Sequence, residues 1–105
     1  MGDRTAMVTR LTPLVMASTT REYVHIPVPG SDALTTPPEI AFTLTADEPE
    51  EDARHEGAWV EGSARLLIGP DGGDVQLPDG RYHIWVRFTA GAERPVRKAG
   101  QLFIT

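Results

Sequence analysis

The 105-residue sequence contains no cysteine, which excludes disulfides, thiolate metal sites and cysteine nucleophiles. It also lacks any run of 18 apolar residues, so no membrane-spanning helix is expected. The first residues lack the apolar core of a signal peptide, because Thr9, Arg10, Thr12 and Pro13 interrupt them. The net charge of −5 argues against non-specific nucleic-acid binding. We therefore expect a folded domain with no direct nucleic-acid contact and no membrane contact.

Long helices are not expected in this chain, and lysine and asparagine are rare or absent. Nine Pro and ten Gly interrupt the chain about once every five or six residues, which leaves little room for long helices. Lys98 is the only lysine beside nine arginines, and asparagine is absent. Because the favoured residues have GC-rich codons, we expect a GC-rich genome, and a coding sequence near one half GC would contradict this.

Alternation of apolar and polar residues is the main pattern that is present, and it predicts β-strands. Strands are expected at 23–28, 40–44, 58–61, 64–68, 75–77, 82–88 and 102–104, with one or two more within 6–18. Seven or eight short strands with turns every 8–12 residues are typical of a β-sandwich or barrel. Because Pro27 has no N–H, its strand is expected to lie at a sheet edge or to carry a bulge. The segment 46–56 is expected to be a loop or a short helical turn.

The apolar faces of these strands predict one core with Tyr82 at its edge. The expected members are Val24, Ile26, Ile40, Phe42, Leu44, Leu66, Ile84, Val86 and Leu102. We expect residues 21–105 to form this single domain. Residues 1–20 are expected to form either an N-terminal arm that lies on a neighbouring subunit or the first strands.

The stretch 77–86, Leu-Pro-Asp-Gly-Arg-Tyr-His-Ile-Trp-Val, resembles the corner before a late strand in immunoglobulin-like and fibronectin-like sandwiches. The resemblance implies an all-β fold, a single immunoglobulin-like or fibronectin-like sandwich of about seven to eight short strands. It also implies that the Tyr82 hydroxyl bonds back to nearby backbone.

A longer resemblance covers the C-terminal half. It is carried by Ala-Arg-Leu-Leu-Ile-Gly-Pro at 64–70, Gly-Arg-Tyr-His-Ile-Trp-Val-Arg at 80–87 and Glu-Arg-Pro-Val-Arg-Lys-Ala-Gly at 93–100. This order resembles small structural proteins of tailed bacteriophages that infect GC-rich bacteria, and 22–28 fits the same family more loosely. The departures are Ile68 for a usual Val, and Ala-Gly-Ala at 90–92 in place of a "t-D-x-p" turn.

The phage resemblance implies a non-enzymatic virion structural protein, made in the host cytoplasm, that acts as a capsid accessory or head–tail connector (neck) component. Its partners would be other virion proteins and copies of itself, with no cofactor. One alternative is a tail or baseplate protein. Another is a carbohydrate- or surface-binding module, in which Trp59, Tyr82 or Trp85 stacks on sugar.

Candidate contact residues follow from the polar face of 82–88 and from charge. Trp and Arg are enriched at interface hot spots. The expected interface comprises Trp85, Arg87, Arg94, Arg97 and Lys98. Residues 81–105 carry a net charge of +4, whereas 39–56 carry −6, so the two stretches are complementary. The alternatives are a Trp85 that packs under a loop of its own subunit or belongs to the core of the second sheet, and ordinary surface charge without a partner.

No catalytic or metal site is expected. The acidic run from Asp47 to Glu56 lacks the spacing of a calcium loop and contains Pro49, so it is interpreted as a solvated loop. His25, His55 and His83 do not share ligand spacing. No nucleophile, phosphate-binding or dinucleotide motif is recognisable.

Overall fold

The computed structural model describes residues 13–105, which form mainly β-strands, as the alternation predicts. In this part of the chain the helical turns are two short 3-10 helices, η1 at Ser31–Ala33 and η2 at Glu51–Ala53. The strands are β1 (Leu14–Met16), β2 (Glu22–Pro27), β3 (Glu39–Thr43), β4 (His55–Glu56), β5 (Ala58–Val60), β6 (Ser63–Ile68), β7 (Gly80–Arg87) and β8 (Val96–Ile104).

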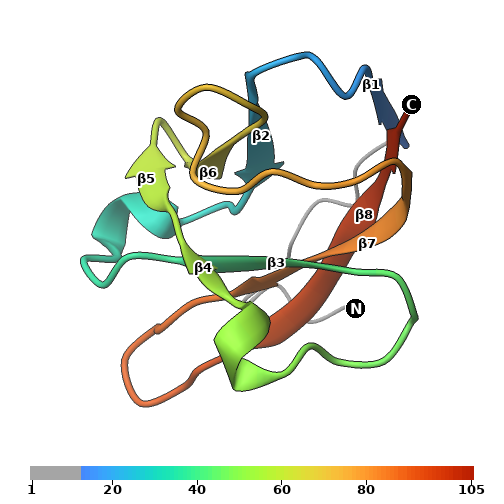
Figure 1. Cartoon of the computed structure of the whole chain (residues 1–105). Coiled ribbons are helices and arrows are strands. Elements are labelled where there is room, and N and C mark those ends of the chain that lie inside the picture. Colours follow the sequence, from blue (N-terminus) through green and yellow to red (C-terminus); the bar gives the residue numbers. More distant parts are fainter. Residues whose placement is uncertain (1–12) are drawn as a thin grey trace.

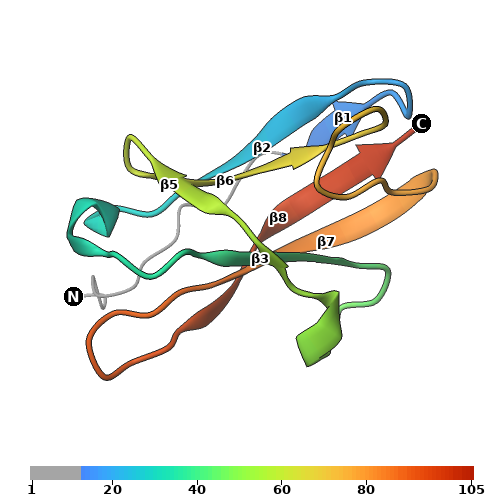
Figure 2. The ribbon, with the colours of Figure 1, turned by 60° about the vertical axis from the view of Figure 1, so that its left-hand side comes forward.

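The strands form two sheets (Figure 1). Sheet A has five strands in the order β1-β8-β7-β3-β4, and sheet B has three in the order β2-β6-β5. β1 runs parallel to β8, whereas the other neighbouring pairs are antiparallel. Figure 2 shows the two sheets as two layers, with β2, β5 and β6 in one layer and β3, β7 and β8 in the other. The arrangement is compatible with an all-β sandwich.

One hydrophobic core takes side chains from both sheets. Its fully buried members include Val24, Ile26, Leu66, Ile40, Ile84, Val86 and Leu102. The alternation predicts all of them, because residues two apart on a strand share a face. Tyr82 is buried at 6% exposure beside them.

The core prediction is wrong for Leu44, whose side chain is 69% exposed. β3 ends at Thr43 and the chain then leaves the sheet through a series of bends, so the alternation no longer places Leu44 over the core. Phe42 is half-buried and packs against the core. Ala41 is expected to point away from the core, yet it is fully buried. At Ala41, the side of β3 turned away from the core is therefore covered as well.

β2 lies at an edge of sheet B, as Pro27 predicts. Pro27 is opposite Ser63 in the β2–β6 register, and proline is tolerated there because an edge strand leaves one side of its backbone unpaired. The next residue, Val28, donates its N–H to the Gly62 carbonyl at 2.9 Å. The pairing of β2 with β6 therefore continues past the proline.

The hydrogen bond expected from Tyr82 to nearby backbone is present. The Tyr82 hydroxyl donates a hydrogen bond to the Pro78 carbonyl at 2.6 Å. Burial, with a smaller contribution from the nearby Asp79 charge, raises the pKa of the Tyr82 hydroxyl. The bond ties the loop before β7 to the strand that fills the middle of the core.

Two connections differ from the sequence expectation. The strand expected at 75–77 is reduced to one bridge between Val75 and Ile68, and the short strand β4 forms within the acidic region.

Gly69, after β6, has a φ of 120°, and a Cβ there would collide with the Thr20 carbonyl oxygen. A glycine is therefore required for the β1–β2 connection to pass this close to the end of β6.

Of the N-terminal segment expected as an arm or as first strands, residues 1–12 lie outside the described residues. Residues 13–20 contain β1, and Leu14 and Met16 lie opposite Leu102 and Ile104 of β8.

Candidate functional site

The five predicted contact residues lie on two different sides of sheet A. Trp85 of β7 is opposite Lys98 of β8, so both side chains share the face turned away from sheet B. Arg97 is opposite Val86, whose side chain is buried in the core, so Arg97 points to the other side of the sheet. The prediction grouped Arg97 with Lys98, but neighbouring strand residues alternate between faces. We call the face of sheet A turned away from sheet B the outward face.

Trp85 is half-buried on the outward face. Its indole Nε1 donates to the Thr43 Oγ1 at 3.0 Å, and the Lys98 Nζ lies 5.5 Å from the centre of its ring. Ala41, its cross-strand neighbour, has no exposed surface. Trp85 therefore packs partly on its own chain and leaves the remainder of its surface exposed. Its position is intermediate between an exposed contact residue and a residue buried under its own chain.

Arg87 is buried, with a side chain only 8% exposed. Its Nε donates to the Glu39 Oε1 at 2.7 Å, while Nη1 and Nη2 donate to the two Glu51 carboxylate oxygens at 2.9 and 2.7 Å. The paired geometry with Glu51 is the one that suits a guanidinium and a carboxylate. Arg94 lies near this group, with its Nη2 3.7 Å from the Glu39 Oε1.

Arg87 stabilises the negative charges of both carboxylates, and they stabilise its positive charge. Hydrogen bonds from Arg87 lower the pKa of the Glu51 carboxyl to about 2 and also lower the pKa of Glu39. The same bonds, first to Glu51 and then to Glu39, raise the pKa of the guanidinium. The Arg87 donors are thus occupied by carboxylates of their own chain. Arg87 holds η2 on the outward face through these bonds, and its part in an interface stays a prediction.

The acidic run is fixed to the sheet through Glu51, but most of its charge faces solvent. Arg54 is its only arginine or lysine, and that side chain is 3% exposed. The Arg54 Nη2 lies 3.3 Å from both the Glu48 Oε2 and the Pro49 carbonyl. With its cation turned inward, the segment presents carboxylates to solvent.

The aromatic residues of the sugar-binding alternative are engaged with their own chain. The Trp59 Nε1 donates to the Thr36 carbonyl at 2.8 Å, and its ring meets Phe88 edge-on with centroids 6.0 Å apart. Tyr82 is buried. Trp85 is half-buried, as Trp59 is, and Lys98 lies over its ring.

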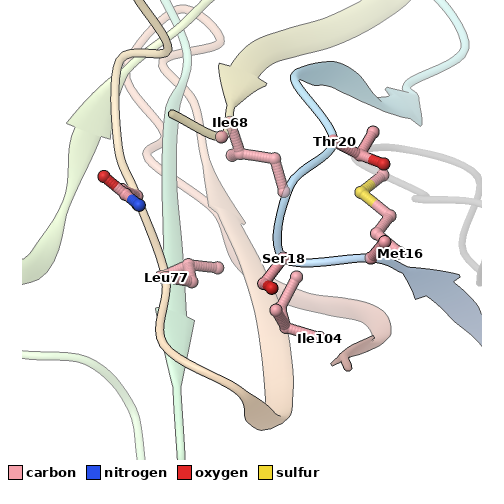
Figure 3. A pocket seen from close by; sticks show the side chains of 9 residues that line it. Met16, Ser18, Thr20, Ile68, Leu77 and Ile104 are labelled. Carbon is pink, nitrogen blue, oxygen red and sulfur yellow. The ribbon is translucent and has the colours of Figure 1, made fainter. Parts of the chain in front are cut away.

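A small pocket opens between the end of β1, the end of β6 and the loop before β7 (Figure 3). It encloses about 240 Å³ including its open mouth, and none of its lining side chains is titratable. Its residues therefore offer no acid or base for catalysis. In residues 13–105 no three His, Asp or Glu side chains gather in a way that could hold a metal ion.

Sequence reasoning missed Glu39, Glu51 and Thr43, which complete the outward face. Glu39 lies opposite Arg87 in the β3–β7 register, so alignment of the two alternating patterns could have paired them. Glu51 reaches Arg87 across 36 residues from a turn without periodicity, and no local signal announces that contact.

Comparison of the sequence with protein-family models, with curated proteins and with solved structures found no match. In residues 13–105, no helix is long and apolar enough to cross a membrane.

Proposed function

We propose that the chain is a non-enzymatic structural protein of a bacteriophage virion, a capsid accessory or head–tail connector component that acts through protein–protein contacts. The observation that carries the proposal is the ordered set of stretches at 64–70, 80–87 and 93–100, which resembles small virion proteins of tailed phages. These stretches coincide largely with β6, β7 and β8, three strands that all contribute to the core. The resemblance therefore concerns the framework of the domain.

The finer fold type that we propose is immunoglobulin-like. In that fold one sheet contains strands B, E and D, and the other contains G, F and C, with C′ added in variable-type domains. Sheet B, in the order β2-β6-β5, and the run β8-β7-β3-β4 of sheet A follow these orders. The bond from Tyr82 to Pro78 supports the same type, because a tyrosine corner precedes strand F there.

A contact function is supported by what the surface offers. The described pocket is small and has no titratable lining, whereas the outward face of sheet A combines a half-exposed Trp85 with Lys98 and Arg94. Trp and Arg are the residues most enriched at interface hot spots.

The test is the composition of purified phage particles. We expect the protein to remain with particles through a density gradient and a salt wash, at a copy number that fits the symmetry of the head or neck. An abundant non-structural protein of the same phage serves as the control and should be lost. Absence of the chain from washed particles would overturn the proposal. Immunogold labelling then separates a head or neck position from a tail or baseplate position.

A further inference from the structure

The outward face of β1, β7 and β8 is basic and partly apolar. The register places Val15 beside Phe103, Phe103 beside Arg81, and Trp85 beside Lys98. Val15 is 67% exposed, and the Arg81 guanidinium lies 5.4 Å from the Phe103 ring centre. None of the three strands contains an Asp or Glu. We call these five residues the basic strip.

The acidic segment, residues 47–56, provides the opposite charge. Asp47, Glu50 and Asp52 are exposed, and within residues 13–105 they take part in no ion pair. Arg54, the cation of the segment, is turned inward as described above. The exposed carboxylates are therefore available to a basic partner.

Both regions belong to the same side of sheet A. Arg87 and Trp85 are two residues apart on β7 and share a face, and Arg87 reaches Glu51 of η2. Figure 2 shows η2 on the side of sheet A that is away from sheet B. One face of the molecule thus carries two neighbouring halves of opposite charge, and the Arg87–Glu51 pair fixes the acidic half in place.

We propose that two copies of the chain associate through this outward face about a two-fold axis, with the basic strip of each copy on the acidic segment of the other. A two-fold contact uses the same patch on both copies, so a patch must complement itself. Rotation by half a turn about an axis in the plane of the face, between the two halves, places each half on its opposite. Charge complementarity also opposes other registers, in which like charges would meet.

The apolar part of the strip fits the same contact. Val15 and Phe103 lie beside Arg81 at the edge of sheet A, where a second copy would remove Val15 from water. This inference rests on the contact half of the proposed function and deepens it, because it names a second copy of this chain as the partner.

The first test is the oligomeric state of the purified protein by size exclusion with light scattering. We expect a dimer at low salt that dissociates as salt is raised, because the contact joins exposed charges. A protein that stays monomeric at low salt across the accessible concentration range would overturn the proposal. An open series of larger species would overturn the two-fold axis.

Charge reversal tests the surface itself. The double variant Arg81→Glu/Lys98→Glu and the triple variant Asp47→Lys/Glu50→Lys/Asp52→Lys are each expected to be monomeric. Mixed in equal amounts, the two variants should form a heterodimer, because both contacts are then complementary again. The matched control is Arg97→Glu, which reverses a charge on β8 on the other side of the sheet and should leave the dimer intact. Variants that dimerise separately, or a mixture that stays monomeric, would contradict the proposed surface.

Lys98 lies over Trp85, so its reversal could affect folding. Val15→Glu is the second variant: it changes one exposed side chain and should abolish the dimer while the melting temperature of the monomer stays unchanged. A dimer that survives this substitution would contradict the proposal. If the wild-type protein is a monomer but is found in phage particles, the dimer proposal is wrong and the virion role stands. If the protein is a dimer but is absent from particles, the virion role is wrong and the dimer proposal stands.

Discussion

The two faces of sheet A bury their residues by different means. On the face toward sheet B, aliphatic side chains such as Ile40, Ile84 and Val86 pack on one another and on sheet B. On the outward face, Ala41 and Arg87 are also buried, but there the neighbours are an indole, two carboxylates and the 3-10 helix η2. Aliphatic burial depends on apolar area, which salt and pH barely change. Burial through ion pairs depends on charge state, so the two faces should respond differently to the same treatments.

The largest effect is expected from a cavity on the inner face. Ile84→Ala should lower the free energy of unfolding by about 2–5 kcal/mol, through lost transfer energy and an unfilled cavity. Phe42→Ala should cost less, because that side chain is half-buried. Denaturant unfolding at low and high salt measures both, and the loss for Ile84 should be the same at each. A loss below about 0.5 kcal/mol, the scale of a surface change, would place Ile84 outside the core.

On the outward face, the matching change is Arg87→Met. We expect a loss of about 1–2 kcal/mol, less than for a fully buried pair, because solvent reaches both carboxylates once the cation is gone. Glu51 is 75% exposed, which is the reason for this discount. Unlike the loss at Ile84, this one should shrink at high salt. Arg87→Lys keeps the positive charge but not the bidentate guanidinium geometry, so its stability should lie between that of Arg87→Met and that of wild type. Equal stability of Met and wild type would show that the ion pairs contribute nothing net.

Acid should act on the outward face first. The pKa of Glu51 is about 2 in the folded chain, held there by hydrogen bonds from Arg87, against 4.5 ordinarily. A lowered folded-state pKa contributes stability above the unfolded pKa, and this is lost as pH falls from about 4.5 toward 2. Melting temperatures across this range should therefore fall less steeply for Glu51→Gln than for wild type. If the melting temperatures of Glu51→Gln and wild type fell equally steeply with pH, Glu51 would not contribute to the loss of stability in acid.

The smallest effect is expected at Leu44. Leu44→Ser should change the free energy of unfolding by no more than about 0.5 kcal/mol, because the side chain is exposed at the end of β3. Denaturant unfolding beside Ile84→Ala tests this directly. A loss of unfolding free energy as large as that of Ile84→Ala would show that the Leu44 side chain is buried in the core.

The local pattern was sufficient for most of the core, because residues that alternate along a strand share one face of it. Val24, Ile26, Ile84 and Val86 follow from it, and Pro27 indicated an edge strand because it has no N–H to donate. Leu44 shows its limit, since alternation does not say where a strand ends.

The outward face depends on contacts across long stretches of chain. Arg87 was expected at an interface, but the carboxylate that it meets in a bidentate pair belongs to η2 of the same chain. Likewise, the split of Arg97 from Lys98 follows from the β7–β8 register, which composition does not contain.

The parallel pairing of β1 with β8 has a mechanical consequence. Leu14 lies beside Leu102, and at the other end of the pair the Thr105 N–H donates to the Met16 carbonyl at 3.0 Å. A tension that draws Leu14 and Thr105 apart pulls the two strands along their length in opposite directions. The hydrogen bonds between them are then loaded together in shear, whereas an antiparallel hairpin pulled from its open end parts one bond at a time. A domain joined this way resists stretching through its ends more than its modest size suggests.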